Sequence, residues 1–156
     1  MVVKSSVLKE LEECYRESGN QLVVLYGRTD SEKERLLGAF VQNKKHFYYR
    51  ARQVAERGQR AQMGRELTAR FEVMLQKYTY EEYFNRVKSG DPTKLVVVID
   101  EFQYIAKKDP TFMEAVLKLK VHRLYPGPVM ILLCSSAVSW AERELAECIG
   151  EAACRK

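Results

Sequence analysis

Four short strand-like segments, which alternate with segments of helical periodicity, constrain the fold of this chain more than any other feature of its sequence. The segments are residues 22–26, 44–51, 94–105 and 129–136. Most are apolar along much of their length, as strands are when helices cover both faces of a parallel sheet. We therefore predict an α/β fold with a mainly parallel sheet of about four strands and helices on both faces.

Helical periodicity and capping residues locate the helices between these strands. They are expected at residues 6–18, 32–42, 53–77, 110–125 and 139–149, with a further helix after residue 79. Thr79 is followed three residues later by Glu82, which is the capping-box pattern. Asp109 precedes a proline that suits the first turn of a helix.

Two groups of side chains within residues 53–84 are expected to pack in the core. The first recurs on one face of the helix 53–77 and comprises Met63, Leu67, Phe71 and Met74. The second comprises Tyr78, Tyr80, Tyr83 and Phe84, for which packing onto the sheet is a more ordinary role than stacking on bases.

Length and composition favour one domain, residues 1–156, in the cytoplasm. The longest apolar runs, residues 95–99 and 129–134, are too short to cross a bilayer, and the N-terminus has no apolar signal region. The four cysteines and two histidines lack the spacing of a zinc site or a disulfide framework. No membrane partner is therefore expected.

Polar residues follow three of the predicted strands at their carboxyl ends. They are Gly27 to Lys33 after the first strand, Asp100 and Glu101 in the third segment, and Ser135 and Ser136 in the fourth. Ligands of open parallel sheets bind beyond the carboxyl ends of the strands. We therefore expect a binding site at this edge of the sheet.

The loop after the first strand has part of a phosphate-binding motif. A P-loop reads G-x-x-x-x-G-K-[ST], and residues 27–34 read G-x-x-x-x-E-K-E. Glu32 stands at the position of the second glycine, and Glu34 stands at the position of the hydroxyl residue.

Four segments, in order, carry a family resemblance: LYGRTDSEKERLL, FYYRA, LVVVIDEFQYI and ILLCSSAVS. Over about residues 8–140 the chain resembles the AAA-related P-loop ATPases of archaea and bacteria. The resemblance implies a three-layer P-loop NTPase-like sandwich, with ATP and Mg²⁺ as cofactors.

The resemblance also implies roles for single residues. Gly27 and Arg28 match the start of the phosphate loop, Lys33 matches the lysine that neutralises the β- and γ-phosphates, and Glu34 stands where magnesium is ligated. Asp100 matches the aspartate that holds the magnesium shell. Glu101 matches the carboxylate that orients the attacking water, and Ser135 or Ser136 matches a polar sensor.

The departures from the family pattern oppose phosphate binding. Asp30, Glu32 and Glu34 would crowd three carboxylates into an anion site, unless Arg28, Lys33 and Arg35 pair with them. We therefore expect a domain with weak or no ATP hydrolysis that acts as a protein-interaction or regulatory module. A functional ATP-binding or ATP-hydrolysing enzyme is the alternative, which leaves the enzyme assignment open.

The chain also stops early relative to the resembling family, after the sensor-like strand and one helix. In that family the strand order is 5-1-4-3-2, so loss of the fifth strand would leave residues 22–26 at an edge. An apolar edge strand invites pairing. We expect a second copy, the N-terminal helix 6–18 or a protein partner to cover it.

The net charge of +5 suggests a third interpretation. Seven basic residues lie within residues 50–77: Arg50, Arg52, Arg57, Arg60, Arg65, Arg70 and Lys77. A basic stripe can bind nucleic acid by releasing counterions from phosphates. More often such a stripe is a solvated helix face, so nucleic acid is a less favoured partner.

Overall fold

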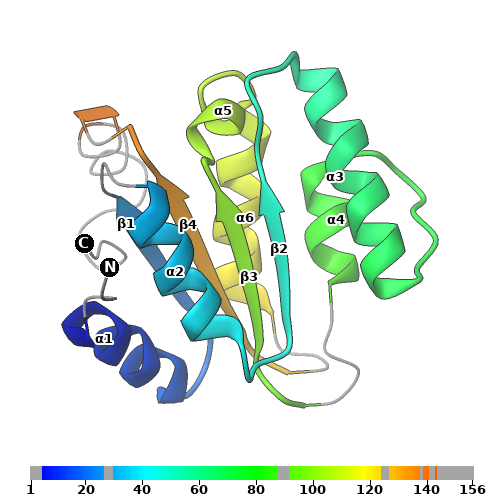
Figure 1. The fold of residues 1–156 in the computed structure, drawn as a ribbon. Helices are drawn as coiled ribbons and strands as arrows, with labels where there is room; N and C mark the ends of the chain where they lie inside the picture. Colours follow the sequence, from blue (N-terminus) through cyan, green and yellow to red (C-terminus); the bar gives the residue numbers. More distant parts are fainter. Residues whose placement is uncertain are drawn as a thin grey trace.

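The computed structural model describes residues 5–26, 30–87, 92–123, 127–137, 139, 140 and 143. All the strands in these ranges run parallel and form one sheet in the order β1-β4-β3-β2 (Figure 1). The strands are β1 (Gln21–Tyr26), β2 (His46–Arg50), β3 (Leu95–Asp100) and β4 (Val129–Ser135). The predicted α/β architecture with a four-stranded parallel sheet is confirmed.

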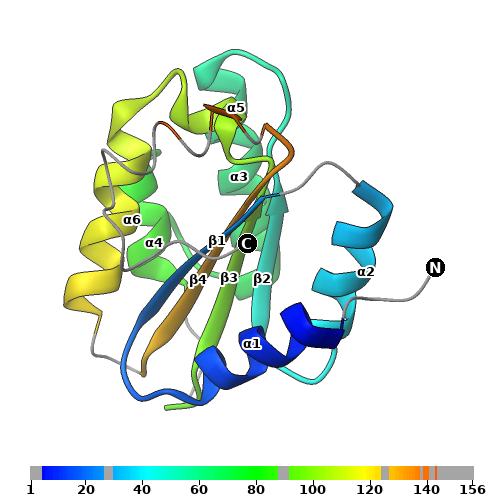
Figure 2. The ribbon, with the colours of Figure 1, turned by 90° about the vertical axis from the view of Figure 1, so that its left-hand side faces the viewer.

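Helices cover both faces of this sheet (Figures 1 and 2). One layer contains α1 (Ser5–Arg16) and α2 (Asp30–Val41), and the other contains α3 (Glu56–Phe71), α4 (Tyr80–Arg86) and α6 (Pro110–His122). A single turn, α5 (Gln103–Ala106), follows β3. The third segment predicted from the sequence is residues 94–105, with its strand ending in two carboxylates, and the observed strand ends at the first of them, Asp100.

The central strands bury side chains on both faces, which explains their apolar sequences. Val96 and Val98 of β3 pack in the cluster beneath α1 and α2, whereas Val97 and Ile99 pack in the cluster beneath α4 and α6. Every residue of β3 and of β4 is buried. Two hydrophobic cores therefore share one sheet.

Helix α1 packs on a face of the sheet rather than along an edge. Leu11 is buried in the same cluster as Leu37 and Phe40 of α2, and Lys94 Nζ donates to the carbonyls of Tyr15 and Glu17 at the end of α1. A cation at a helix C-terminus also suits the helix dipole. In the described residues, no strand pairs with the outer side of β1.

The predicted caps of α4 and α6 are present, although the Glu82 carboxylate accepts from the Gln76 backbone N–H instead of completing a capping box. The Thr79 side chain accepts a hydrogen bond from the Glu82 backbone N–H, and the Asp109 side chain accepts one from the Thr111 backbone N–H. Pro110 occupies the first turn of α6. These caps satisfy backbone N–H groups that have no partner within the helix.

Helix α3 is shorter than its sequence periodicity predicts. It ends at Phe71 because Glu72 adopts a left-handed conformation, with φ of 52°, and donates its N–H to the Thr68 carbonyl. Met63 and Leu67 are buried as expected, but Met74 lies beyond the helix and is 85% exposed. The prediction that Met74 belongs to the core was wrong.

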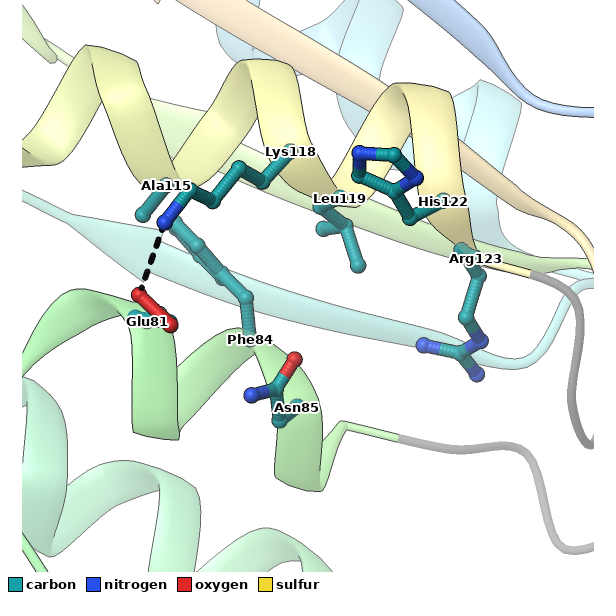
Figure 3. Close-up of a pocket in the computed structure, with 8 residues that line it drawn as sticks. All are labelled: Glu81, Phe84, Asn85, Ala115, Lys118, Leu119, His122 and Arg123. Carbon is teal, nitrogen blue, oxygen red and sulfur yellow. Dashed lines mark hydrogen bonds and ion pairs between the residues drawn. The ribbon is translucent and has the colours of Figure 1, made fainter.

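A pocket of about 430 Å³ lies between α4 and the C-terminal half of α6 (Figure 3). It is called the α4–α6 pocket below. Because α6 follows β3 and precedes β4, this half of the helix lies toward the amino ends of the strands (Figure 1).

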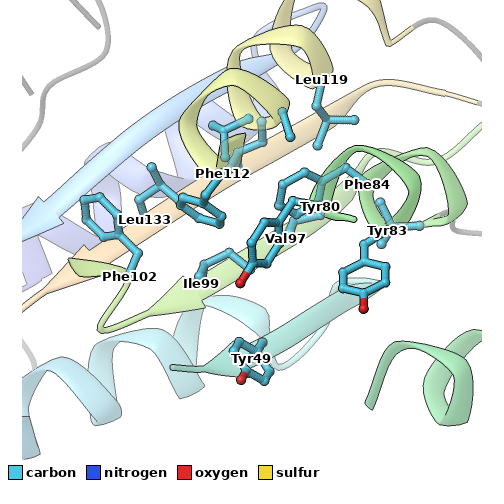
Figure 4. Packing of buried hydrophobic residues seen from close by; sticks show 14 of the residues in the cluster. Tyr49, Tyr80, Tyr83, Phe84, Val97, Ile99, Phe102, Phe112, Leu119 and Leu133 are labelled. Atoms are coloured by element: carbon cyan, nitrogen blue, oxygen red, sulfur yellow. The ribbon is translucent and has the colours of Figure 1, made fainter. Parts of the chain in front are cut away.

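Aromatic side chains fill the core between the sheet and the helices of the second layer (Figure 4). Phe112 of α6 makes ring contacts with Tyr80, Phe84 and Phe102. The expectation that the aromatic residues around Thr79 pack in the core holds for Tyr80, Tyr83 and Phe84, whereas Tyr78 is 70% exposed. The last predicted helix, residues 139–149, lies mostly outside the described residues.

Candidate functional site at the carboxyl edge of the sheet

Three parallel strands and one helix bring polar residues together at one edge of the sheet. The carboxyl ends of β1, β4 and β3 are adjacent, with Tyr26 opposite Ser135 and Asp100 opposite Cys134. Helix α2 begins at the same edge and supplies Lys33 from its first turns (Figure 1). Parallel strand order, together with the start of α2, therefore places the predicted lysine, carboxylates and serines at one edge.

Lys33 lies between the two adjacent carboxylates. Its Nζ is 3.0 Å from Asp100 Oδ1 and 3.1 Å from Glu101 Oε1. The three side chains are 6%, 0% and 7% exposed, respectively. Charges buried so deeply are stable only when they are paired and hydrogen-bonded, so Lys33 holds the two carboxylates together.

The backbone of Glu101 explains how both carboxylates reach the same ammonium group. Adjacent strand residues point to opposite faces, and the sequence placed these two side chains apart unless the backbone turned. Glu101 adopts φ of 55°, which ends β3 and directs its side chain toward Lys33. A left-handed conformation is uncommon for a residue other than glycine, and such conformations cluster at functional sites.

Ser136 fixes the other contacts of Glu101. The Ser136 backbone N–H donates to Glu101 Oε1 at 2.8 Å, and its Oγ donates to Oε2 at 2.8 Å. Ser135 is buried and its Oγ accepts a hydrogen bond from the Ala137 backbone N–H. Of the two serines proposed from the sequence, Ser136 is therefore the one in contact with the carboxylate.

Tyr48 is a site residue that the sequence did not reveal. Its Oη donates to Asp100 Oδ2 at 2.6 Å, from the edge strand β2. The period-2 pattern of β2 puts Tyr48 and Arg50 on one face, but the register that places Arg50 opposite Asp100 depends on tertiary pairing. The aromatic residues of β2 indicated a strand, although they did not identify Asp100 as the partner of Tyr48.

Glu34 pairs with strand β2. Its Oε1 accepts a hydrogen bond from Arg50 Nη1 at 2.7 Å, and both side chains are about half exposed. The sequence offered Arg28, Lys33 and Arg35 as partners for the carboxylates of this loop, whereas the structure pairs Glu34 with Arg50 of β2. Gly27, Arg28 and the side chain of Asp30 lie outside the described residues.

The contacts at this edge shift several pKa values, among them those of Lys33, Glu101 and Tyr48. Burial alone would lower the pKa of Lys33, but Asp100 and Glu101 raise it above its ordinary value. Burial alone would raise the pKa of Glu101, but hydrogen bonds from Ser136 and Lys33 lower it. Burial and the hydrogen bond to Asp100 raise the pKa of Tyr48. Lys33 and Glu101 are therefore charged at neutral pH.

A small aromatic group adjoins this edge. Phe102, directly after Glu101, lies 5.5 Å from the ring of Trp140, and Lys107 Nζ lies 5.5 Å from the Trp140 ring centroid. The backbone N–H of Phe102 also donates to the Cys134 carbonyl of β4. The turn that carries Glu101 is therefore fixed on both its backbone and its side-chain side.

Comparison with known proteins identifies the fold. No protein-family model matches the sequence. The Walker-type ATPase PABY2304 of Pyrococcus abyssi superposes on 98% of the chain with a TM-score of 0.61 at 17% identity. The Orc1 protein of Aeropyrum pernix, solved in complex with DNA, superposes on 97% with a TM-score of 0.57 at 16% identity. The chain has a P-loop NTPase-like fold.

The relatives of this P-loop NTPase-like chain are longer than it is. A curated protein, uncharacterized protein MJECL04 of Methanocaldococcus jannaschii, is 26% identical over 147 residues, which is 92% of this chain and 31% of that protein. The chain spans 53% of the Pyrococcus structure and 44% of the Aeropyrum structure. The likeness therefore concerns one region of each relative.

Nucleotide and Mg²⁺ are the cofactors that this fold suggests, and carboxylate and hydroxyl oxygens are suitable Mg²⁺ ligands. In the present arrangement three of the four carboxylate oxygens accept hydrogen bonds, and Asp100 Oδ1 has, in the described part of the chain, only its ion pair with Lys33. Asp100 faces Lys33 and Tyr48, and Glu101 faces Lys33 and Ser136. Within the described ranges, no group of three metal-ligating side chains converges. These residues fit a Mg²⁺ ion only if Lys33 or Tyr48 releases a carboxylate oxygen.

The basic stripe of this P-loop NTPase-like chain is partly neutralised by carboxylates. Arg50 pairs with Glu34, and Arg60 Nη1 lies 2.9 Å from Asp109 Oδ2. Arg52 and Arg57 are exposed. The stripe is therefore not one continuous field of unpaired charge.

None of the helices in the described ranges is long and apolar enough to span a bilayer.

Proposed function

We propose that this chain is an ATPase-like domain with a degenerate phosphate loop, which binds Mg-ATP weakly or not at all and serves as a protein-interaction or regulatory module. One observation carries the proposal. The lysine that the resemblance assigns to the phosphates is buried between Asp100 and Glu101, at 3.0 and 3.1 Å.

Electrostatics gives the reason. A phosphate that binds Lys33 must compete with both carboxylates, and it is repelled by any that remain nearby. Two like charges about 4 Å apart repel by about 4 kcal/mol at the effective dielectric of a protein surface. Each 1.4 kcal/mol changes affinity by about tenfold. Competition from two carboxylates is therefore large enough to abolish micromolar binding.

The loop sequence adds a second reason. A P-loop binds phosphate with backbone N–H groups, and glycine allows the close approach that this requires. Glu32 adds a Cβ and a carboxylate at that position. Glu34 removes the hydroxyl that would ligate Mg²⁺, and Arg50 already holds its carboxylate. The interactions of the domain are therefore expected to be with proteins.

The outer side of β1 is the proposed place for such a partner. Its apolar residues lie at one end of the strand order, and α1 packs on a face of the sheet instead. An open edge strand offers backbone groups to a second strand. A second copy of the chain or a protein partner would satisfy them.

Restoring the loop tests the proposal about nucleotide. The variant Glu32→Gly/Glu34→Thr regains the G-x-x-x-x-G-K-T pattern, and Glu13→Gln/Glu114→Gln is its control because it removes two exposed carboxylates elsewhere. Titration of Mg-ATP by calorimetry should give no micromolar binding with the wild type or the control, and at least tenfold tighter binding with the restored loop.

Two outcomes would count against the proposal. The first is a micromolar dissociation constant for Mg-ATP with the wild-type chain. The second is steady phosphate release by the wild type that Asp100→Asn abolishes, which would favour the alternative of a functional ATPase.

A further inference from the structure

The α4–α6 pocket is lined by residues different from those of the candidate site at the carboxyl ends of the strands. Six of the side chains that line it are Phe84, Asn85, Ala115, Leu119, His122 and Arg123 (Figure 3). Its volume of about 430 Å³ lies within the range of small-molecule sites. It lies toward the amino ends of the strands, whereas Lys33 lies near their carboxyl ends, so the pocket and the candidate site are separate.

Arg123 is the main polar group of this pocket. It is partly buried, and its Nε donates to the Gly127 carbonyl at 3.0 Å. No carboxylate of the described residues forms an ion pair with it, whereas the guanidinium of Arg50 is paired with Glu34. Burial lowers the pKa of Arg123, while the hydrogen bond to Glu34 raises that of Arg50. Arg123 therefore carries a partly desolvated charge with no counter-ion among the described residues.

The neighbours of Arg123 are polar on one side and apolar on the other. Asn85 of α4 and Arg123, directly after α6, project toward one another across the pocket (Figure 3). Phe84 and Leu119 are buried and form an apolar wall. One charged fork beside an apolar wall suits a ligand with an acidic group on an apolar body.

The remaining charges around the pocket favour an anion as well. Lys118 pairs with Glu81 at 3.2 Å, and both of these side chains are more than half exposed (Figure 3). His122 adds an imidazole next to Arg123. An exposed ion pair is weak, so the Glu81 carboxylate offsets only part of the positive potential near Arg123.

We propose that the α4–α6 pocket binds a small organic anion, in which a carboxylate or phosphate group pairs with the Arg123 guanidinium and an apolar body lies against Phe84 and Leu119. The two terminal nitrogens of a guanidinium bind such oxyanions through paired hydrogen bonds. Asn85 donates a further hydrogen bond from its amide. Carboxylates and phosphates share this chemistry, so the test separates them.

Four probes test the pocket: benzoate, phenyl phosphate, benzyl alcohol and inorganic phosphate. Each is titrated into the ¹⁵N-labelled full chain and followed by ¹H–¹⁵N correlation spectra. Benzoate, phenyl phosphate or both should shift the resonances of Asn85, Leu119 and Arg123 and saturate. Benzyl alcohol lacks the charge and inorganic phosphate lacks the apolar body, so both should bind at least tenfold more weakly. The tighter of the two aromatic anions identifies the acidic group.

Variants locate the binding. Arg123→Gln should weaken it at least tenfold, and Arg123→Lys should give an intermediate loss because it keeps the charge without the planar fork. Lys120→Gln removes a positive charge three residues earlier, outside the pocket, so it should leave binding unchanged. Glu81→Gln removes the one carboxylate among the described residues that line the pocket, so it should tighten binding.

Two results would overturn the proposal. One is equal binding of benzoate and benzyl alcohol, since the charge would then contribute nothing. The other is unchanged affinity in Arg123→Gln together with an unchanged spectrum elsewhere, which shows an intact fold. If Arg123→Gln fails to fold, two other variants test the proposal. Aromatic anions should bind more weakly to Asn85→Ala and more tightly to Glu81→Gln. Unchanged binding in both variants would refute the proposal.

Discussion

The carboxyl-edge site is formed by a few residues that neutralise one another. Lys33 contributes one positive charge between two carboxylates, and Tyr48 and Ser136 donate hydrogen bonds to the remaining oxygens. A low effective dielectric makes such contacts strong when complete and costly when broken. Single substitutions here should therefore affect stability more than similar changes on the surface.

The hydrogen bond from Tyr48 to Asp100 gives the first prediction. Tyr48→Phe removes the donor and leaves a fully buried carboxylate oxygen without it, so the free energy of unfolding should fall by about 1–2 kcal/mol. Urea titration measures the change. Tyr78→Phe is the control, because its ring is 70% exposed, and it should change the stability by less than about 0.5 kcal/mol.

The lowered pKa of Glu101 gives a prediction about pH. The folded carboxyl holds its proton less tightly than the unfolded one, whose pKa is near the ordinary value of 4.5. Its stabilising contribution is therefore complete above about pH 4.5 and is lost as pH falls through the lower folded pKa. Ser136→Ala removes one cause of the shift, so it should cost about 1 kcal/mol at pH 7 and less at pH 3.

Urea unfolding between pH 3 and pH 7 checks this prediction, with Ser139→Ala as a control at an exposed serine. A constant difference between Ser136→Ala and the wild type across that range would show that the Ser136 hydroxyl does not act through the Glu101 carboxylate.

The helices and strands differ in how far their boundaries and contacts could be predicted from the sequence. The apolar strand β3 and the caps of α4 and α6 could be predicted, because burial and capping select residue types locally. The end of β3 could not, because Glu101 turns to meet Lys33 and Ser136, which lie far away in sequence. Tyr48 was missed for the same kind of reason, since its partner depends on strand register.

The start of β4 offers a prediction at the scale of elements. A Cβ on Gly127 would lie 2.5 Å from the Pro92 carbonyl oxygen, a backbone atom that cannot move alone. Gly127→Ala should therefore lower the free energy of unfolding by about 1–3 kcal/mol. Gly58→Ala is the matched control, because nothing lies within 4 Å of its added Cβ, and in helix α3 it should stabilise by up to about 1 kcal/mol.

Thermal and urea unfolding of the two alanine variants should therefore shift in opposite directions. Equal effects of both would mean that the contact between Gly127 and Pro92 imposes no constraint on the connection into β4.

The whole molecule is held together by a parallel sheet that is fully buried only at its centre. Strands β3 and β4 lie between the other two, and no residue of either is exposed. Strand β2 lies at one end of the order and exposes Tyr48 and Arg50. Local opening should therefore begin at the ends of the sheet rather than at its centre.

Hydrogen exchange measures this ordering. Amides of Val97, Val98, Ile131 and Leu132 should exchange only through global unfolding, whereas hydrogen-bonded amides of β2 should exchange faster through local opening. Protection of β2 equal to that of β3 would contradict the prediction.

Slower exchange of β1 at higher protein concentration would support the proposed partner at its outer side.

Trp140 gives the molecule a built-in optical reporter. It is the single tryptophan of the chain, and its ring lies against Phe102, the residue directly after Glu101. Indole emission excited selectively above the tyrosine band therefore originates beside the turn that positions the two carboxylates. Rearrangement of that turn, by a ligand, a proton or a partner, is thus open to observation by fluorescence in the unlabelled wild-type chain.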